Sequence, residues 1–452
     1  MQTRTKAAGL AALCIAIVVV ASACGNSGST NKTSSTIAKG GSTPSVSTDP
    51  NAFKQHLPVT APGVTDTEIR VAVVATKTNN PLGADYSILA DGINAYFKMI
   101  NDGGGLYGRQ LKLTSVRDDQ LGANAQTVQA SLSSDKAFAT FGATILFTGA
   151  KALARANQPT FIWNINPEFT GNNNMFADKG ALCFKCPLHI LPWIAKQLGA
   201  TKVGIIAYGV SAESTDCADG IRASFTKYPT ATIAYEDKSL PFAAGLAAQV
   251  TAMKNAGVQL VGTCIDLNES FTLGKEMKRQ GMNAVQSLPN GYDPEFVAKN
   301  ADVFENAIVS PQFVAFEHQP QIPEIQKLFT WAQKIGKPVK EVTAAGWVIA
   351  DEFVTGLKLA GPSFSQQKVI DALNTLTAYS DNGFIQPIDW TKSHQDPLGH
   401  PEVQSKLDCA NFVKVTAGKF VPVYAEPGKP WICFNRTDVT VDTPQHLSFV
   451  TP

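Results

Sequence analysis

The sequence lacks a dominant charge, a second long apolar run and the common catalytic motifs. Its 38 Lys and Arg residues balance 37 Asp and Glu residues for a formal net charge of +1, so no nucleic acid is indicated as a partner. The six His residues are dispersed, with no H-E-x-x-H pair, and no G-x-x-x-x-G-K-[ST] loop occurs. These absences argue against a metalloprotease or a P-loop enzyme, and we expect no cofactor and no metal.

Two further patterns resemble enzyme motifs but stand in the wrong context. Gly103, Gly105 and Gly108 have the G-x-G-x-x-G spacing of a dinucleotide-binding loop, which must follow a strand and open a helix. Here the apolar periodicity predicts a helix over 88–100 before the glycines and a strand over 110–116 after them, so the glycines only turn the chain.

The second pattern is the segment "GVSAE" at 209–213, which follows a predicted strand as the G-x-S-x-G nucleophile motif of hydrolases does. The last position of that motif requires Gly, and Glu213 occupies it here. We therefore expect a protein that is not an enzyme. Its 44% hydrophobic content with 24 Phe is ample for a globular core, and 452 residues suggest two lobes or domains.

The N-terminus has the pattern of a secretory signal. Arg4 and Lys6 precede an apolar run over 7–20 that is too short to span a bilayer comfortably. Small residues then lead to Cys24, as in the bacterial lipobox, in which the Cys thiol is diacylated. We predict a lipoprotein signal peptide over 1–23 with lipidation at Cys24; plain secretion is the alternative.

The segment after Cys24 is rich in Ser, Thr and Gly. Residues 24–65 are therefore expected to form a disordered tether. With a lipid on Cys24, the tether would hold the globular body at the outer face of the cytoplasmic membrane, in the cell envelope.

Beyond Cys24 the chain has six cysteines, an even number that favours disulfides in an exported protein. One pair flanks a hairpin predicted to turn at Ala417 and Gly418, and a second lies near the carboxyl ends of strands that parallel pairing would bring together. A thioredoxin-like redox role for the C-x-x-C pair is the alternative, although such a site should open a helix and Pro187 follows here. The expected pairs, among the many that are possible, are Cys409–Cys433, Cys217–Cys264 and Cys183–Cys186.

From Glu68 onward, predicted strands and helices alternate, which indicates parallel strands with helical crossovers on both faces. The alternation restarts after the C-x-x-C pair, so two α/β units of similar size stand in tandem. Later helices predicted over 324–336 and 343–361 have no strand between them. They are expected to pack on a sheet built earlier in the chain.

The chain resembles the type I periplasmic substrate-binding proteins of ATP-driven importers, in the branch that binds leucine, isoleucine and valine. The resemblance rests on 69–120, which includes "NDGGGLYGRQ", and continues through "FATFGATILFTGAKALARANQPTFIWNIN", "KVGIIAYG" and "NAGVQLVGTCID". It covers about residues 66–430. It implies an α/β fold of two Rossmann-like lobes joined by three crossovers, with a ligand cleft between the lobes. Lobe one would be 66–186 and 310–378, and lobe two 187–309 and 379–450.

The resemblance also implies a function. The protein would be an extracytoplasmic, lipid-anchored monomer that captures a small polar or partly apolar solute and delivers it to a membrane-embedded ABC permease. An amino acid, an amide or a small organic acid would be the solute. A ligand sensor of the same fold that signals to a membrane partner is the alternative, and the sequence does not separate the two.

Ligands of open α/β sheets bind beyond the carboxyl ends of the strands. The loops there carry mostly neutral polar and aromatic residues, which suit a small, partly apolar solute, although capping or turn roles are equally compatible with each of them. The candidate ligand-binding residues are Asn79, Asn80, Tyr86, Phe147, Thr148, Asn164, Asn166, Ser211, Glu213, Asp266, Asn268 and Tyr292.

Among these candidates, the family resemblance favours Thr148 and Asn166. The apolar segment 145–147 replaces the small hydroxyl residues usual beside them, which argues against an ordinary amino acid as ligand. Thr148 precedes a predicted helix and, as its N-cap, would converge with free N–H groups on an acceptor group of the ligand. Across the cleft, Asp266 and Glu213 would receive a cationic or hydroxylic group.

Overall fold

The computed structural model describes residues 46–47, 49–80, 82–423 and 430–434, apart from the side chains of Pro50, Ser405 and Lys406. These residues belong to one compact unit. The predicted signal peptide, Cys24 and the first part of the predicted tether lie outside the described residues. Among the helices that are described, none combines the length and apolarity needed to cross a membrane.

The first sheet is five-stranded and parallel, in the order β2-β1-β3-β4-β5. Its interior strand β1 is buried at every position from Val71 to Ala75, which explains the unbroken apolar run there. The strands are β1 (Glu68–Ala75), β2 (Gln110–Asp118), β3 (Ala139–Ala143), β4 (Thr160–Ile162) and β5 (Met175–Ala177).

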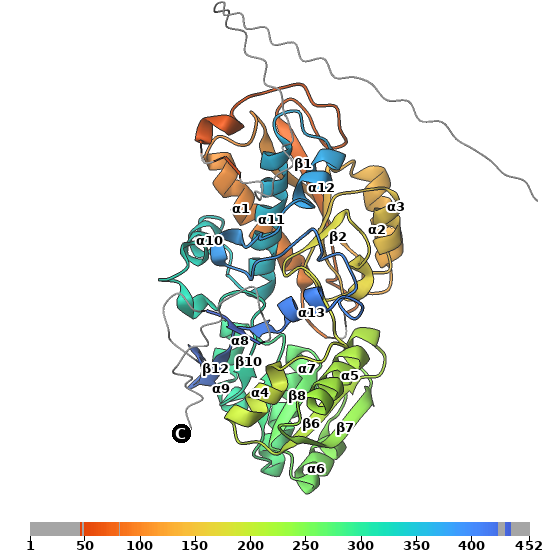
Figure 1. Ribbon diagram of the computed structural model, residues 1–452, viewed down its shortest axis with the longest axis vertical. Coiled ribbons are helices and arrows are strands. Elements are labelled where there is room, and N and C mark those ends of the chain that lie inside the picture. The colour runs from red at the N-terminus through yellow and green to blue at the C-terminus, as the bar shows by residue number, and fades with distance from the viewer. Residues whose placement is uncertain (1–45, 48, 81, 424–429, 435–452) are drawn as a thin grey trace, which may run out of the picture. The chain divides into compact units, whose positions relative to one another are not determined.

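Helices from both halves of the chain cover the first sheet (Figure 1). Three come from the first half: α1 (Leu89–Asp102), α2 (Asn124–Ser134) and α3 (Ala150–Arg155). Three come from the later part: α10 (Pro323–Lys334), α11 (Glu341–Ala360) and α12 (Gln366–Leu373). Short 3-10 turns accompany them at Pro50–Phe53, Tyr86–Ile88, Pro167–Phe169, Phe316–His318 and Asp381–Gly383.

The buried helix α11 packs directly against α1, far from it in sequence. A Cβ on Gly92 of α1 would lie 1.9 Å from the Thr343 carbonyl oxygen, and one on Gly346 of α11 would lie 2.1 Å from the Leu89 carbonyl oxygen. Only residues without a side chain allow this approach. The prediction that the late helices pack on an earlier sheet is confirmed.

The second sheet is seven-stranded, in the order β13-β12-β10-β9-β8-β6-β7. Its first five strands in sequence are parallel, and β12 and β13 add an antiparallel hairpin that turns at Ala417 and Gly418, both with positive φ, as the sequence predicts. The strands are β6 (Lys202–Tyr208), β7 (Thr232–Leu240), β8 (Leu260–Cys264), β9 (Val285–Leu288), β10 (Ile308–Val309), β12 (Val413–Thr416) and β13 (Lys419–Pro422).

The remaining elements accompany the second sheet or lead to it. The helices are α4 (Ile190–Gln197), α5 (Ala212–Lys227), α6 (Ala247–Ala256), α7 (Leu267–Gln280), α8 (Pro294–Lys299), α9 (Ala301–Phe304) and α13 (Pro401–Leu407). A separate two-stranded pair joins β11 (Cys409–Ala410) to β14 (Ile432–Cys433). The result is an α/β fold with two sheets, as predicted.

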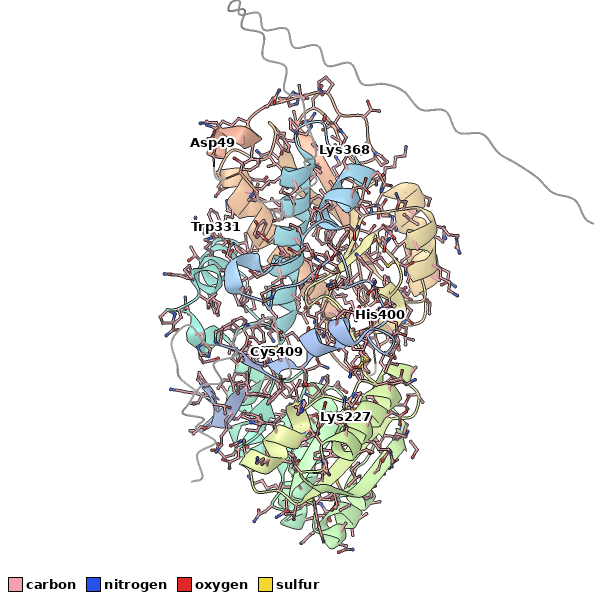
Figure 2. The ribbon with its side chains drawn as sticks, viewed as in Figure 1. Asp49, Lys227, Trp331, Lys368, His400 and Cys409 are labelled. Carbon is pink, nitrogen blue, oxygen red and sulfur yellow. A yellow bond between two sulfur atoms is a disulfide. The ribbon has the colours of Figure 1, made fainter. Side chains whose placement is uncertain are left out.

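The chain crosses from the first sheet to the second for the last time after residue 394, later than the lobe boundary predicted at 379. The Tyr379 hydroxyl donates to the Val348 carbonyl at 3.0 Å, and the Trp390 ring meets the Phe176 ring of β5 at 5.1 Å. Residues 379–394 therefore pack with the first sheet, because these aromatic side chains complete its core. The chain leaves through α13, between His400 and Cys409 (Figure 2).

The predicted tether also ends earlier than residue 65. The Tyr107 N–H donates to the Phe53 carbonyl at 2.7 Å, and the Arg109 guanidinium donates to the Leu57 carbonyl at 2.9 Å. Arg109 is fully buried beneath this segment. A buried guanidinium needs acceptors, and the carbonyls of Leu57, Thr65 and Tyr107 supply them. The segment 53–57 is therefore packed rather than disordered.

The glycine cluster has the role that its sequence context predicts. Gly103 ends α1, and Gly105 and Gly108 both have positive φ in the turn that leads into β2. No helix opens at these glycines, so they do not form a dinucleotide-binding loop.

Candidate functional site

A cavity of about 880 Å³ lies where loops from the carboxyl ends of both sheets meet. This is the edge at which open α/β sheets bind ligands, and the volume is within the ~300–1,000 Å³ typical of small-molecule sites. The first sheet contributes residues of 82–91, Ile145, Trp163 and Lys179. The second contributes residues of 208–217, 263–268, 287–293 and 310–312.

Glu341, the first residue of α11, is a buried carboxyl group in the cavity wall, with 8% of its surface exposed. Its Oε1 has no hydrogen-bond partner among the described residues. Burial raises the pKa of Glu341 to about 7, although Lys179 and a hydrogen bond from the Tyr292 backbone act in the opposite direction. The carboxyl group is therefore available to a ligand, at the energetic cost of burial.

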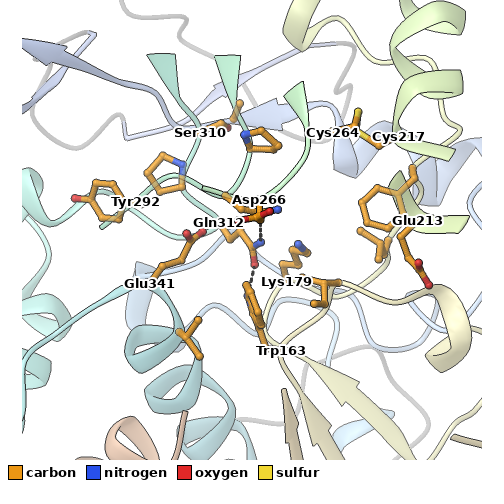
Figure 3. Close-up of a pocket in the computed structure, with 18 of the residues that line it drawn as sticks. Trp163, Lys179, Glu213, Cys217, Cys264, Asp266, Tyr292, Ser310, Gln312 and Glu341 are labelled. Carbon is orange, nitrogen blue, oxygen red and sulfur yellow. Dashed lines mark hydrogen bonds between the residues drawn. A yellow bond between two sulfur atoms is a disulfide. The ribbon is translucent and has the colours of Figure 1, made fainter. Parts of the chain in front are cut away.

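Lys179 follows β5 and faces the same cavity (Figure 3). Burial lowers its pKa, while the neighbouring Asp178 and Glu341 raise it. Among the described residues, no carboxylate lies within 4.0 Å of its ammonium group, whereas the other two lysines in the wall, Lys340 and Lys392, pair with carboxylates at 2.9 and 3.7 Å. Lys179 thus offers a positive charge that the protein itself does not pair.

Asp178, beside Lys179, is a structural neighbour rather than part of the wall. It is 3% exposed and accepts a hydrogen bond from the Asn164 N–H at 2.8 Å. Burial raises its pKa to about 6, against the opposing effects of Lys179 and backbone N–H groups. Its carboxylate thereby fixes the loop that carries Lys179.

Aromatic and amide side chains link the two halves of the site. Trp163 Nε1 donates to Gln312 Oε1 at 3.1 Å, and Gln312 Nε2 donates to Asn290 Oδ1 at 3.3 Å (Figure 3). The Tyr86 ring packs against Trp163 with centroids 5.2 Å apart. An apolar wall with a few fixed polar groups orients a solute that has both kinds of surface.

Asp266 and Ser211 cap helices and line the cavity as well. Asp266 Oδ1 accepts from the Asn268 N–H at 2.8 Å at the start of α7, and Oδ2 accepts from the Tyr208 hydroxyl. Burial raises the pKa of Asp266. Ser211 Oγ accepts from the Ser214 N–H at 3.2 Å and donates to Glu213 at 2.8 Å. Both capping roles considered in the sequence analysis are present.

The predicted site residues divide into two groups. Their role in ligand binding stays a prediction for the six that line the cavity: Tyr86, Ser211, Glu213, Asp266, Asn268 and Tyr292. Outside the cavity lining are Asn79, Asn80, Phe147, Thr148, Asn164 and Asn166.

The polar residues outside the cavity stabilise loops, and the prediction that Thr148 caps the following helix is wrong. Thr148 is exposed, and its Oγ1 accepts from the Ala125 N–H at 3.2 Å instead of capping α3, which begins after Gly149. Asn166 Nδ2 donates to the Thr144 carbonyl at 2.7 Å. Asn164 Nδ2 donates to the Gly180 carbonyl at 2.7 Å.

The remaining three candidates outside the cavity also have structural roles. Phe147 is 4% exposed in the core of the first sheet, so apolar packing has taken it out of the cavity wall. Asn80 Nδ2 donates to the Ala84 carbonyl at 2.8 Å, while Asn79 adopts a positive φ in the same exposed turn. These asparagines shape the loop rather than the cavity.

Sequence reasoning missed Trp163, Lys179, Gln312 and Glu341. Trp163 directly precedes the predicted candidate Asn164, so the loop was found but not the residue. Lys179 and Glu341 carry no local motif. The available signal for Lys179 was a pair of charged residues, Asp178 and Lys179, directly after the short apolar run 175–177.

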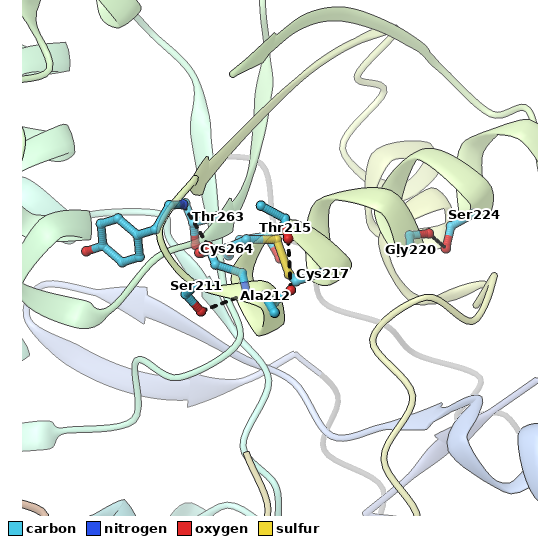
Figure 4. Close-up of a disulfide and its surroundings, with 11 residues drawn as sticks. Ser211, Ala212, Thr215, Cys217, Gly220, Ser224, Thr263 and Cys264 are labelled. Atoms are coloured by element: carbon cyan, nitrogen blue, oxygen red, sulfur yellow. Dashed lines mark hydrogen bonds between the residues drawn. A yellow bond between two sulfur atoms is a disulfide. The ribbon is translucent and has the colours of Figure 1, made fainter. Parts of the chain in front are cut away.

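The three disulfides are those predicted: Cys183–Cys186, Cys217–Cys264 and Cys409–Cys433. The second joins the first turns of α5 to the end of β8, beside the cavity (Figure 4). The Cys183–Cys186 pair does not open a helix, since α4 starts at Ile190, so its context is not that of a thioredoxin-like site. Among the described residues, no cluster of three or more His, Cys, Asp or Glu is arranged to hold a metal ion.

Helix α5 also fixes the segment that leads out of the first sheet. A Cβ on Gly220 would lie 1.8 Å from the Phe184 carbonyl oxygen. Ser224 Oγ donates to the Gly220 carbonyl at 2.7 Å and accepts from the Leu188 N–H at 2.9 Å (Figure 4). The segment 184–188 thus rests on the helix backbone itself.

We predict that Gly220→Ala lowers the free energy of unfolding by about 2 kcal/mol, because the new methyl group must displace the segment 184–188. Urea unfolding measures the change. The matched control is Gly245→Ala, at an exposed position where a Cβ meets nothing within 4 Å. The free energy of unfolding of this control variant should stay the same or rise slightly. Equal behaviour of the two variants would show that the close contact is unimportant.

Comparisons with known proteins agree with this geometry. A family profile described as "Periplasmic binding protein" matches residues 68–419. A fatty acid ABC transporter substrate-binding protein from Thermomonospora curvata is 18% identical, with a TM-score of 0.64 over 83% of this chain and 94% of that one. A comparison with curated proteins found no significant match.

Two further solved structures have a similar fold. A branched chain amino acid ABC transporter protein from Thermus thermophilus with bound valine is 18% identical, with a TM-score of 0.64 over 80% of this chain and 97% of that one. A solute binding protein from R. palustris in complex with 4-hydroxybenzoate is 15% identical, with a TM-score of 0.63 over 79% of this chain and 96% of that one.

Proposed function

This chain belongs to the periplasmic binding protein family, whose members bind solutes and are not enzymes, and from that premise we propose that it delivers a small, partly apolar solute to an ABC importer. The family implies an extracytoplasmic location. The solute would enter the cavity between the two sheets and favour the closed arrangement by contacting residues of both.

The observation that carries this proposal is the presence of unpaired polar groups in a cavity whose wall is mainly apolar by area but also carries paired charges. Lys179 lacks an ion-pair partner and Glu341 Oε1 lacks a hydrogen-bond partner among the described residues, while Asp266 lines the same cavity from a loop of the second sheet. Burying such groups costs free energy that a bound solute would recover. A purely structural cavity would not need them.

The ligands named for the similar structures support a carboxylate-bearing solute. Valine, 4-hydroxybenzoate and fatty acids share a carboxylate and differ in the apolar part. A carboxylate on the solute would give Lys179 the ion-pair partner that the protein does not supply. The cavity wall would then determine which apolar parts of a solute fit. Amino acids, amides, and aromatic and aliphatic acids are therefore the classes to test.

A thermal-shift screen of the exported protein against these classes tests the function. A solute at 100 times its Kd should stabilise the folded state by about 2.7 kcal/mol, which gives a clear rise in melting temperature. Saturable stabilisation by one class, confirmed by calorimetry, is the expected result. If no solute of the panel stabilises the protein, the proposed function is wrong.

Delivery to an importer is proposed over signalling because the similar structures named above belong to ABC transporters. Deletion of the protein should abolish uptake of its solute by intact cells, and the wild-type gene should restore it. Unchanged uptake with a lost transcriptional response to the solute would favour the sensor instead.

We further propose that Cys24 carries a lipid anchor, since small residues precede it at the end of a secretory signal. Two acyl chains suffice for stable membrane attachment. We predict that Cys24→Ala moves the protein from the membrane to the soluble exported fraction, as seen by immunoblotting of fractions, and that Cys183→Ala does not. Recovery of soluble wild-type protein with an unmodified N-terminus would contradict the anchor.

A further inference from the structure

The cavity extends well beyond the polar groups just described. One group of lining residues, which we call the polar end, consists of Lys179, Gln312 and Glu341 with Trp163. A second group consists of large aliphatic and aromatic side chains that are only partly buried and carry no charge. We call it the apolar chamber; its residues are Leu182, Phe184, Leu188, Ile221, Leu407 and Trp431.

The apolar chamber is assembled from distant parts of the chain. Helix α5 contributes Ile221, the end of α13 contributes Leu407, and the segment before β14 contributes Trp431. Together with the segment 182–188, apolar side chains from four separate segments therefore line the same cavity. A monomeric protein rarely leaves such surface uncovered without a ligand or partner for it.

One continuous segment joins the polar end to the apolar chamber. Between β5 and α4, seven of the ten residues from Lys179 to Leu188 line the same cavity, and the Cys183–Cys186 disulfide closes a short loop among them. Helix α5 fixes this segment through Gly220, as described above. The wall between the two ends is thus covalently and sterically fixed, so the cavity is one preformed space.

We propose that the solute is an amphiphilic carboxylate whose head group binds at Lys179 and Glu341 and whose apolar body, longer than an amino-acid side chain, occupies the apolar chamber. This inference rests on the proposed function and names the chemical class of its solute. The volume of about 880 Å³ lies near the upper end of the ~300–1,000 Å³ seen for drug-sized ligands.

The position of Lys179 in the wall favours a carboxylate as the group that binds there. The ammonium group of Lys179 has no carboxylate within 4.0 Å among the described residues, so it can pair with one from the solute. Glu341, whose pKa is raised to about 7, can donate a proton to the second carboxylate oxygen.

The other acidic groups near the cavity are already engaged. Asp266 accepts hydrogen bonds from the Tyr208 hydroxyl and the Asn268 N–H, and Glu213 accepts one from Ser211. Asp293 is paired with Lys340 and Asp389 with Lys392. The ion pairs compensate Asp293 and Asp389, whereas Asp266 and Glu213 keep their negative charge, so the preference for a carboxylate depends on the position of Lys179.

Calorimetry with straight-chain alkanoates from butanoate to dodecanoate tests the proposal. Each methylene group buried in the chamber should tighten binding about fourfold, so affinity should rise continuously through decanoate. Decylamine, the cationic analogue of matched length, should bind at least ~100-fold more weakly than decanoate, because it would place a second cation beside Lys179.

Two variants distinguish the contribution of the apolar chamber to binding from that of the polar end. Leu407→Asp and Phe184→Ser each make the chamber more polar from a different segment. Both should flatten the gain with chain length while leaving butanoate affinity within about twofold. Melting curves show which variants fold, and either folded variant suffices for the comparison.

The outcomes distinguish this inference from the proposed function. If affinity peaks at four to six carbons, or if decylamine binds as well as decanoate, the inference is wrong. If no alkanoate binds but another class in the thermal-shift panel does, the inference is wrong and the proposed function stands. If nothing in either experiment binds, the proposed function fails as well.

Discussion

Replacement of Glu341 by Gln is expected to raise the free energy of unfolding of the ligand-free protein by about 3 kcal/mol at pH 8. In the folded protein, burial raises the pKa of Glu341 to about 7, against an ordinary value of 4.5. Above pH 7 the wild type must therefore keep a buried negative charge that the unfolded chain solvates freely. Gln has a similar shape and no charge, so the variant avoids this cost.

The effect should depend on pH with a defined sign. Below pH 4.5 both states of the wild type hold the proton, and the variant has no advantage. Between pH 4.5 and 7 the unfolded state releases the proton first, so wild-type stability falls relative to the variant as the pH rises. Urea unfolding at about pH 4 and pH 8 measures this difference.

The control for this experiment is Glu295→Gln. Glu295 is exposed on α8, and its bond to Lys299 lowers its pKa, so its removal should change stability little and in the opposite direction. A Glu341→Gln variant with the same advantage at both pH values, or with none, would show that the Glu341 charge is not destabilising.

The second large effect is expected for Lys179→Met, which should weaken binding of the tightest solute of the screen about tenfold to a hundredfold. A hydrogen bond to a charged group contributes roughly 1.5–3 kcal/mol, and Met keeps the length of the side chain while removing the charge. Calorimetry of the wild type and the variant gives the ratio of Kd values.

Lys392→Met is the matched control, because Lys392 lines the same cavity but is paired with Asp389 at 3.7 Å. Its replacement should change Kd by no more than about threefold, as expected for a partly exposed pair. Equal losses in the two variants would indicate a general electrostatic effect, and an unchanged Kd for Lys179→Met would exclude Lys179 from the site.

The fold was largely predictable because its signals are local. Residues close together in the sequence are enough to predict the buried run of β1, the helical periodicity of α1 and the turn at Ala417 and Gly418. The error at residue 379 has a tertiary cause. Trp390 packs with the first sheet because its ring contacts the Phe176 ring, and no sequence pattern around Trp390 predicts that contact.

The site was predictable only in part, because strand order places the loops but not the direction of each side chain. Asp266 and Tyr292 were found by their position after strands of the second sheet. Thr148 and Asn166 also follow strands, yet they bond to the backbone at Ala125 and Thr144. Glu341 reaches the cavity from the start of a helix that returns to the first sheet, which no strand-end rule covers.

The most direct test of the account is a crystal structure of the protein with the tightest solute of the screen. We expect the solute in the cavity between the two sheets, with a polar atom within about 3.2 Å of Lys179 Nζ and its apolar part against Trp163 or the apolar chamber. A solute bound elsewhere, for example against Thr148 and Asn166, would contradict the assignment of this cavity as the binding site.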